Sequence, residues 1–226
     1  MTPAAAEPLI RMRDVFKIYR EGDVETVALR GADLEIQRGS VTSLMGRSGS
    51  GKSTLLMLIA GLAQPSAGQI LLDGRDIGRL DEAERSRIRA EHIGIVFQSG
   101  NLIPFLTARE NVETAMAYGR RTTARAIDLL AAVGVAELAD RLPTQVSGGE
   151  AQRVAIAVAL ANAPDLLLAD ELTGELDSAT AQDILDLLLR LHAERGLTIL
   201  LVTHNPEIAR QADRALVVND GTVRSA

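Results

Sequence analysis

The chain gathers three glycines, a lysine and neighbouring hydroxyl groups into one short run, Gly46-Arg47-Ser48-Gly49-Ser50-Gly51-Lys52-Ser53-Thr54. Glycine adopts backbone angles that other residues avoid, so consecutive N–H groups of such a run can turn inward and surround an anion. The flanking residues predict a buried strand at Val41–Met45 and a helix from residue 53 to about 61, whose free N-terminal amides favour phosphate. A strand, a glycine-rich loop and a helix in this order predict a site for the phosphates of a nucleotide.

The polar residues of this run are expected to hold ATP and Mg²⁺. Lys52 would reach the β- and γ-phosphates of ATP, and the Ser53 hydroxyl would bind Mg²⁺. The other positions would surround the phosphates; they are Gly46, Arg47, Ser48, Gly49, Ser50, Gly51 and Thr54. The alternative interpretation is a glycine-rich turn that binds nothing.

Composition and charge narrow the possible functions. The chain has 226 residues, of which 46% are hydrophobic, which is enough for the core of one domain with or without an inserted lobe. Its net charge is −6, and its 22 arginines and 2 lysines are dispersed, so nucleic-acid binding is not predicted.

Hydropathy and cysteine content indicate the cellular location of the protein. Its longest apolar stretches, such as 166–169 and 199–202, are far shorter than the roughly 20 residues of a membrane span. The chain has no cysteine, hence no disulfide, and its first residues lack the pattern of a secretory signal. A cytosolic location is therefore expected.

Strand and helix signals alternate along the chain and predict an α/β fold. Short strands separated by turn signals between residues 10 and 72 predict a mixed sheet with an antiparallel flank. Later, strands at 166–169 and 197–202 enclose an amphipathic helix at about 178–195, which predicts parallel βαβ units.

Helix signals dominate the middle of the chain. They include a capping box at Thr107-Ala108-Arg109-Glu110 ahead of a helix that ends near Gly119. We therefore expect a single domain over residues 1–226. It would consist of a nucleotide-binding core at about 1–98 and 161–226 and an inserted α-helical lobe at about 99–160.

Two carboxylates, Asp170 and Glu171, follow the apolar strand at 166–169. Burying acids at the end of a strand costs free energy unless a cation or hydrogen bonds compensate them. Mg²⁺ would be such a cation, so Asp170 is predicted to bind the metal through water, and Glu171 to act as general base on the attacking water. The alternative is a strand that simply leads into a helix cap.

A second glycine-containing run, Ser147-Gly148-Gly149-Glu150, precedes an apolar helix. Ser147 as N-cap with Glu150 three residues later is good helix chemistry on its own. The two glycines could also expose the helix amides to a second phosphate contact. Since the helical lobe separates this run from residues 46–54, a second subunit would be the better source of that contact.

Six motifs in one order make the chain resemble ABC-type ATPase subunits over essentially its whole length. They are an aromatic residue (Tyr19), the Walker A loop (46–54), the Q-loop glutamine (Gln98), the signature (146–150), Walker B with its glutamate (Asp170 and Glu171) and the switch histidine (His204). The resemblance implies a P-loop NTPase (RecA-like) fold and an ATPase that uses ATP and Mg²⁺.

The resemblance also implies roles for single residues. Tyr19 would stack on adenine, Gln98 would touch Mg²⁺ and water while linking to the helical lobe, and His204 would contact the γ-phosphate. Asp177 matches the acid of the D-loop at the subunit contact, although helix N-capping explains it equally well. Tyr19 read without the resemblance is a half-buried strand tyrosine, and Gln98 is a loop amide.

In this family two subunits associate head to tail and sandwich two ATP molecules between the Walker A loop of one and the signature of the other. The residues acting in trans would be Ser147, Gly148, Gly149, Glu150 and Asp177. This chain departs from the usual family pattern in having Glu150, Ala151, Val158 and Leu172. These departures leave the catalytic groups in place. They bear on the rate of ATP turnover and on the strength of the contact between subunits.

Several segments resemble the lipoprotein-releasing, macrolide-exporter and cell-division branch of the family; they are 19–29, 101–104, 107–112 and 203–205. Members of that branch work with a membrane subunit. The expected function is therefore an ATP-hydrolysing homodimer, peripheral on the inner face of the cell membrane, that drives an integral-membrane permease. The alternative is a soluble or cell-division-type ABC ATPase that powers or regulates a protein assembly without transporting a substrate.

Overall fold

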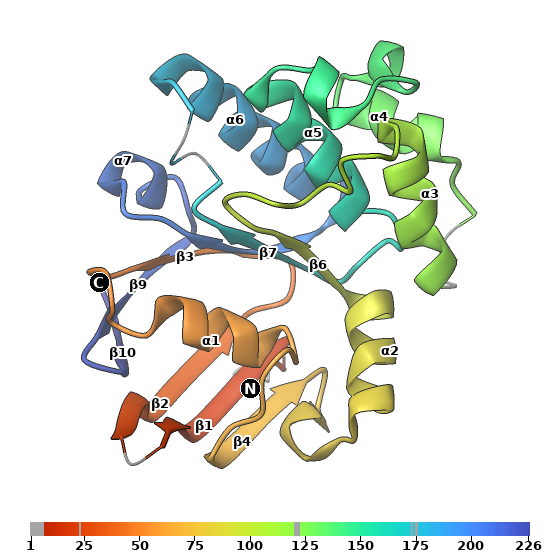
Figure 1. Cartoon of the computed structure of the whole chain (residues 1–226). Coiled ribbons are helices and arrows are strands. Elements are labelled where there is room, and N and C mark those ends of the chain that lie inside the picture. The colour runs from red at the N-terminus through yellow and green to blue at the C-terminus, as the bar shows by residue number, and fades with distance from the viewer. Residues whose placement is uncertain (1–6, 23, 120–122, 173, 175) are drawn as a thin grey trace, which may run out of the picture. The chain divides into compact units, whose positions relative to one another are not determined.

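The structure is a computed structural model that describes residues 7–22, 24–119, 123–172, 174 and 176–226 (Figure 1). The chain divides into two compact units. Unit 1 comprises Met1–Arg85 and Leu200–Ala226, and unit 2 comprises Ser86–Ile199. In the described part of the chain, none of the helices combines the length and hydrophobicity that a membrane crossing requires.

Unit 1 contains the antiparallel sheet expected between residues 10 and 72. Its strand order is β2-β1-β4-β5, and Figure 1 shows the three long strands as neighbours; the strands are β1 (Ile10–Glu21), β2 (Val24–Ile36), β4 (Ala67–Leu72) and β5 (Arg75–Asp76). In the register of β1, Ile10 faces Ile36 on one side and Leu72 on the other, and all three side chains are buried. The predicted antiparallel flank is confirmed.

A second group of strands in unit 1 carries the glycine-rich loop. β3 (Val41–Met45) pairs in parallel with β9 (Arg214–Asn219), which forms a hairpin with β10 (Thr222–Ser225). The turn of this hairpin is Asp220-Gly221, where both residues have positive φ (46° and 76°), a conformation that suits this dipeptide. The final residues of β8 (Thr198–Val202) lie on the other side of β3.

Three short helical elements and the start of a longer helix complete unit 1; they are α1 (Lys52–Ile59), η1 (Ile77–Arg79), α7 (Pro206–Ala209) and the first residues of α2 (Glu82–His92). α1 begins one residue earlier than predicted and buries Leu55, Leu56, Leu58 and Ile59. A helix with so apolar a face is held by the core rather than by intrinsic propensity.

Unit 2 combines two parallel strands with most of the helices of the chain. β6 (Ile93–Val96) pairs with β7 (Leu166–Asp170), so that Val96 faces Ala169. The helical elements are α3 (Ala108–Tyr118), α4 (Ala126–Ala132), η2 (Ala136–Leu138), η3 (Pro143–Gln145), α5 (Gly148–Ala159) and α6 (Ser178–Arg195). A Cβ at Gly94 would lie 2.4 Å from the carbonyl oxygen of Ala159, so glycine permits α5 to pack closely on β6.

Helix boundaries in unit 2 follow the capping residues. Thr107 caps α3 in a capping box with Glu110, and α6 ends before Gly196, which takes a left-handed conformation with φ of 63°. α4 begins after Arg125, its N-cap residue, whose guanidinium bonds the Asp128 carboxylate. The α/β fold class is confirmed, while the division into a core and a helical lobe at residues 99–160 stays a prediction.

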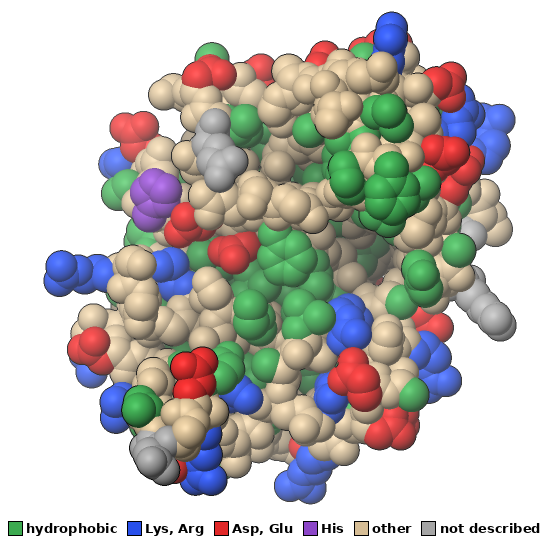
Figure 2. All heavy atoms as spheres, in the orientation of Figure 1, with side chains coloured by type: hydrophobic (Ala, Val, Ile, Leu, Met, Phe, Trp, Pro, Cys, Tyr) green, Lys and Arg blue, Asp and Glu red, His purple; other side chains and the backbone are tan. Residues whose placement is uncertain are grey.

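The surface carries charges of both signs. On the face shown in Figure 2, lysine and arginine side chains are interspersed with aspartate and glutamate rather than gathered in one basic patch. This distribution differs from the basic stripe that nucleic-acid-binding proteins present.

Candidate nucleotide-binding site

Steric exclusion shapes the loop between β3 and α1. A Cβ at Gly46 would lie 2.6 Å from the carbonyl oxygen of Val218, and a Cβ at Gly51 would lie 2.7 Å from that of Ala28. Both neighbours are backbone atoms that cannot move aside easily. Gly51 also has a φ of 109°, which residues with a side chain rarely adopt. The two glycines therefore fit the loop closely against β9 and β2.

Lys52 lies folded onto this loop. Its ammonium group donates hydrogen bonds to the carbonyl oxygens of Gly46 (2.9 Å) and Arg47 (3.1 Å), and the residue is only 8% exposed. The amide of Gly221 in the β9–β10 turn donates to the carbonyl oxygen of Ser50 (3.0 Å). The cation is thus bonded to the backbone of the loop, and the loop is bonded in turn to the β9–β10 hairpin.

His204 belongs to unit 1 and follows the end of β8. The amide of Thr203 donates to the carbonyl oxygen of Leu44 in β3 (3.2 Å), and the Thr203 hydroxyl accepts from the amide of Asn205 (3.0 Å). His204 itself is exposed. Because the carboxyl ends of neighbouring parallel strands meet at one sheet edge, His204 and the loop that follows β3 share that edge. Thr203, which fixes this junction, was named in the sequence only within the segment 203–205 and was given no role of its own.

Tyr19 lies near the end of β1 and is 38% exposed. The ammonium group of Lys17 stands 4.9 Å from the centroid of its ring, a cation–π contact. Sequence reasoning missed Lys17, although its spacing of two residues from Tyr19 on a strand is the signal that could have found it.

In unit 2, Asp170 is the last residue of β7 and Glu171 follows it. Both carboxylates are partly exposed, and Glu171 has a φ of 47°, a left-handed conformation that costs of the order of 1–3 kcal/mol in a residue other than glycine. The amide of Gly174 donates to the Glu171 carbonyl oxygen (3.0 Å) and closes the turn. Such strain, kept by surrounding structure, is typical of functional positions.

Gln98 follows the neighbouring strand β6 and is exposed. Its side-chain nitrogen lies 3.3 Å from where a Cβ on Gly174 would be, which places Gln98 beside the turn after Glu171. The parallel pairing of β6 with β7 thus places Gln98, Asp170 and Glu171 at the carboxyl ends of adjacent strands.

The signature run forms the capped start of α5. Ser147 accepts a hydrogen bond from the amide of Glu150 (3.3 Å), and the Glu150 carboxylate accepts from the amide (2.7 Å) and hydroxyl (2.8 Å) of Ser147. These bonds lower the pKa of Glu150 below its usual range, with the backbone bond from Ser147 as the largest cause. The predicted capping box is confirmed, and Ser147 and Gly148 are exposed.

Asp177 caps the next helix, α6, beside this segment. Its carboxylate accepts from the amides of Ala179 (3.0 Å) and Thr180 (3.1 Å) and from the Thr180 hydroxyl (2.6 Å). A Cβ at Gly149 would lie 2.7 Å from the Thr180 methyl group, so the starts of α5 and α6 touch. The N-capping interpretation of Asp177 is therefore correct, and its role at a subunit contact stays a prediction.

The residues present suit a nucleoside triphosphate and Mg²⁺. Unit 1 offers a lysine ammonium, the free amides at the start of α1 and the exposed hydroxyl of Ser53, all of which favour phosphate or its metal. Unit 2 offers two carboxylates and an amide oxygen, the hard ligands that Mg²⁺ prefers. Taken separately, the groups of unit 1 fit the phosphates of ATP, and those of unit 2 fit Mg²⁺.

Comparisons with known proteins agree with this chemistry. The family model described as ABC transporter matches residues 29–174. The chain is 45% identical over 95% of its length to a lipoprotein-releasing system ATP-binding protein of Rhodopseudomonas palustris, of which it covers 98%. It is equally 45% identical to a macrolide export ATP-binding/permease protein of Marinobacter nauticus, and it spans only 34% of that protein.

Solved structures give the same result for the fold. A dimeric bacterial ABC transporter cassette matches with a TM-score of 0.87 and 41% identity over 95% of this chain and 96% of that one. A dimeric ATP-binding cassette in a post-hydrolysis state, bound to ADP and Pi, matches with a TM-score of 0.87 and 39% identity, and the match covers 96% of this chain and 98% of that one. The fold is therefore that of a P-loop NTPase, and the chain belongs to the ABC transporter family as an ATP-binding cassette.

Proposed function

We propose that the chain binds and hydrolyses ATP as the cassette of an ABC transporter, and that head-to-tail closure of two copies drives a separate membrane subunit. The observation that carries the proposal is the contrast between a closely fitted phosphate loop and an exposed, capped signature segment in one chain. Dimeric solved cassettes and the coverage of a lipoprotein-releasing relative add support.

Within one copy, the loop at 46–54 holds the phosphates. Lys52 exchanges its two loop carbonyls for the β- and γ-phosphate oxygens of ATP, a stronger charge-assisted interaction. His204 donates a hydrogen bond to the γ-phosphate, and Tyr19 stacks on the adenine. Ser53, Gln98 and Asp170 are the residues that would hold Mg²⁺, which would supply positive charge against the phosphates.

Glu171 acts as the general base. Its carboxylate takes a proton from the water whose oxygen attacks the γ-phosphorus, while the bond to the β–γ bridging oxygen breaks. Glu171 directly follows β7 in a left-handed backbone conformation, which the rigid strand end supports. A carboxylate held in this way needs little reorganisation when the water reacts.

The second copy supplies the signature. Ser147, Gly148, Gly149 and Glu150 offer the start of α5 to the γ-phosphate of the opposite nucleotide, and Asp177 lies at the subunit contact. Because the partner completes the phosphate contacts, ATP binding and dimer closure are one event. ADP release reopens the dimer, and the membrane subunit receives the movement.

The membrane subunit is a separate integral-membrane permease, and the cassette sits peripherally on the cytoplasmic face of the membrane through it. This assignment rests on the lipoprotein-releasing relative, which the chain covers almost completely. Purification of the tagged chain from detergent-solubilised membranes tests it. Recovery of an integral-membrane protein in fixed stoichiometry is expected; recovery of a soluble assembly alone would favour the alternative function.

Substitution of the general base tests the chemistry. Glu171→Gln should keep MgATP binding, lower hydrolysis by about 10²- to 10⁴-fold, the range of general-base catalysis, and accumulate an ATP-bound dimer in light scattering. Glu194→Gln, at an exposed position in α6, is the matched control and should behave as wild type. Retained turnover in Glu171→Gln would remove Glu171 from the role of base.

A further inference from the structure

Lys17 occupies one side of the Tyr19 ring. The two residues lie two positions apart on β1, and the Lys17 ammonium stands 4.9 Å from the ring centroid. Tyr19 remains 38% exposed, so part of its surface is open to a ligand. A cation on one face of an aromatic ring restricts the rotation of the ring and leaves the opposite face for stacking.

The Lys17 ammonium is itself held by a backbone carbonyl. It donates a hydrogen bond to the carbonyl oxygen of Gln64 (2.9 Å), in the segment between α1 and β4. The same segment makes two more hydrogen bonds to β1. The amide of Ser66 donates to the carbonyl oxygen of Phe16 (2.8 Å), and the amide of Ile18 donates to the Ser66 hydroxyl (3.0 Å). Three hydrogen bonds therefore fasten residues 64–66 to β1 beside Tyr19.

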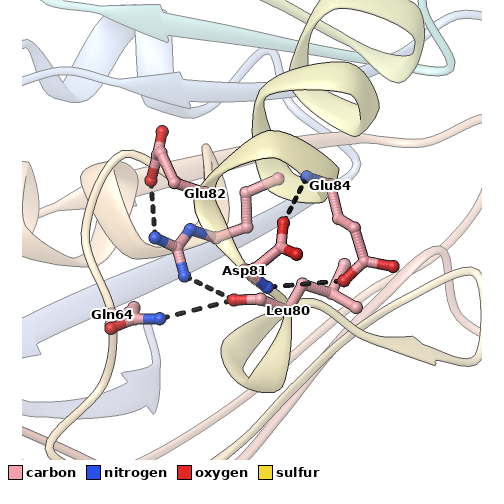
Figure 3. A network of polar contacts seen from close by, with 6 residues as sticks. Gln64, Leu80, Asp81, Glu82 and Glu84 are labelled. Atoms are coloured by element: carbon pink, nitrogen blue, oxygen red, sulfur yellow. Dashed lines mark hydrogen bonds and ion pairs between the residues drawn. The ribbon is translucent and has the colours of Figure 1, made fainter.

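Gln64 is held by a further polar network (Figure 3). Its side-chain amide donates to the carbonyl oxygen of Leu80 (3.4 Å), which also accepts from the guanidinium of Arg85 (2.7 Å). Arg85 is buried and pairs with Glu82 (2.5 Å). The acceptor for Lys17 thus belongs to a segment that is bonded on both sides.

Helix α1 connects this segment to the phosphate loop. It begins at Lys52 in the loop and ends at Ile59, five residues before Gln64. Its eight residues span about 12 Å and form a rigid link. Lys17, residues 64–66 and α1 therefore form a connected path between the ring of Tyr19 and the loop.

We infer that Lys17 is a positioning residue for the base of the nucleotide: it holds the Tyr19 ring from one side so that the other side is ready to stack on adenine. This inference rests on the proposed function, in which Tyr19 receives the base. Preorganisation of the ring lowers the cost of ordering it on binding, so Lys17 acts on nucleotide affinity and leaves the phosphate contacts unchanged.

Tyrosine fluorescence isolates this effect. The chain has no tryptophan and two tyrosines, Tyr19 and Tyr118, so Tyr19 is the sole tyrosine in a Tyr118→Phe background. MgATP and magnesium tripolyphosphate, which lacks a base, are titrated into the full chain. The variants are Lys17→Met, which keeps the length of the side chain, and Lys17→Arg, which keeps the cation. Arg20→Met is the matched control, since Arg20 is a neighbouring cation paired with Glu25 (2.8 Å).

The parent should show quenching of Tyr19 emission by MgATP. Lys17→Met should weaken MgATP binding by about two- to fivefold, the size of an exposed cation–π contact, and leave tripolyphosphate binding unchanged. Lys17→Arg should restore the affinity, and Arg20→Met should match the parent. Thermal unfolding checks that each variant is folded.

Two other results would overturn the inference in different ways. If Lys17→Met weakens both ligands equally, Lys17 acts through charge on the phosphates; if it changes neither, the ring needs no support. If MgATP binds the parent without quenching Tyr19, the base does not stack on this ring, and the assignment of Tyr19 in the proposed function fails together with the inference.

Discussion

The phosphate loop of unit 1 and the signature segment of unit 2 are both glycine-containing turns at the start of a helix, yet they are built in opposite ways. The loop is fixed by steric fit, because Gly46 and Gly51 lie against backbone oxygens and the buried Lys52 bonds to carbonyl oxygens of the loop. The signature segment is exposed and is held by hydrogen bonds between Ser147 and Glu150.

This difference indicates how each turn meets a phosphate. The loop already presents a cation and needs only an exchange of acceptors at Lys52. The cap of α5 satisfies the Glu150 amide and leaves the amides of Gly148 and Gly149 at the open end of the helix, as the first amides of a helix are. The first turn is built around a cation of its own, whereas the second presents exposed helix amides, which in the proposed function meet the nucleotide of a second copy.

The largest effect is expected from a steric block at the signature segment. Ser147→Arg should place a bulky side chain at the exposed start of α5 and lower ATP hydrolysis by about 10²- to 10³-fold, the cost of losing one transition-state contact. MgATP binding by the monomer should be unchanged. Steady-state ATPase assays and nucleotide titration measure the two quantities.

Thr107→Arg is the matched control for this change, because Thr107 caps α3 in the same kind of capping box. It loses a cap worth about 1 kcal/mol and should retain hydrolysis. Equal loss of hydrolysis in both variants would mean that cap stability, rather than a contact in trans, explains the effect.

A smaller effect should follow from breaking the shape of the phosphate loop. Gly51→Ala forces a Cβ to 2.7 Å from the Ala28 carbonyl oxygen at a φ of 109°. Strain of roughly 1–3 kcal/mol at the loop should weaken MgATP binding by about 5- to 150-fold. Gly74→Ala has a similarly positive φ of 77° and open space around it, so it should lose stability without losing affinity. Isothermal titration calorimetry separates the two, and equal affinity in both variants would contradict a loop fixed by steric fit.

The smallest effect should be the pH dependence of the signature cap. Because the folded-state pKa of Glu150 is lowered, its contribution to stability is fully present above its ordinary value of 4.5 and is lost as the pH falls through the lower folded value. Protection of the amides at the start of α5 from hydrogen exchange, expressed relative to the intrinsic exchange rate at each pH, should therefore fall on acidification below about pH 4.5 in the wild type. Glu150→Gln keeps the capping geometry without the titration and should abolish this dependence. An unchanged acid profile in the variant would assign the effect to other groups.

The sequence predicted the parts of this molecule that local chemistry determines. The bounds of β3 and α6 and the caps at Thr107 and Ser147 follow from residue types within a few positions of each other. The turn at Asp220-Gly221 likewise follows from local chemistry, since both residues tolerate positive φ.

Features that depend on distant segments were not predictable. Glutamate carries no signal for the left-handed backbone at Glu171, which the turn to Gly174 imposes. The contact of Lys17 with Tyr19 depends on residues 64–66 lying along β1. The close approach of Gly149 to Thr180 depends on the packing of α5 beside α6. Pairing in three dimensions, rather than residue type, decides these positions.

The scarcity of lysine gives the chain an unusual chemical selectivity. Its only side-chain amines are those of Lys17 and Lys52, one beside Tyr19 and one inside the phosphate loop. An acylating reagent that reacts with primary amines would therefore modify, apart from the N-terminal amine, only these two side chains. The ratio of the two acylated peptides in mass spectrometry would record the occupancy of the loop, without any engineered label.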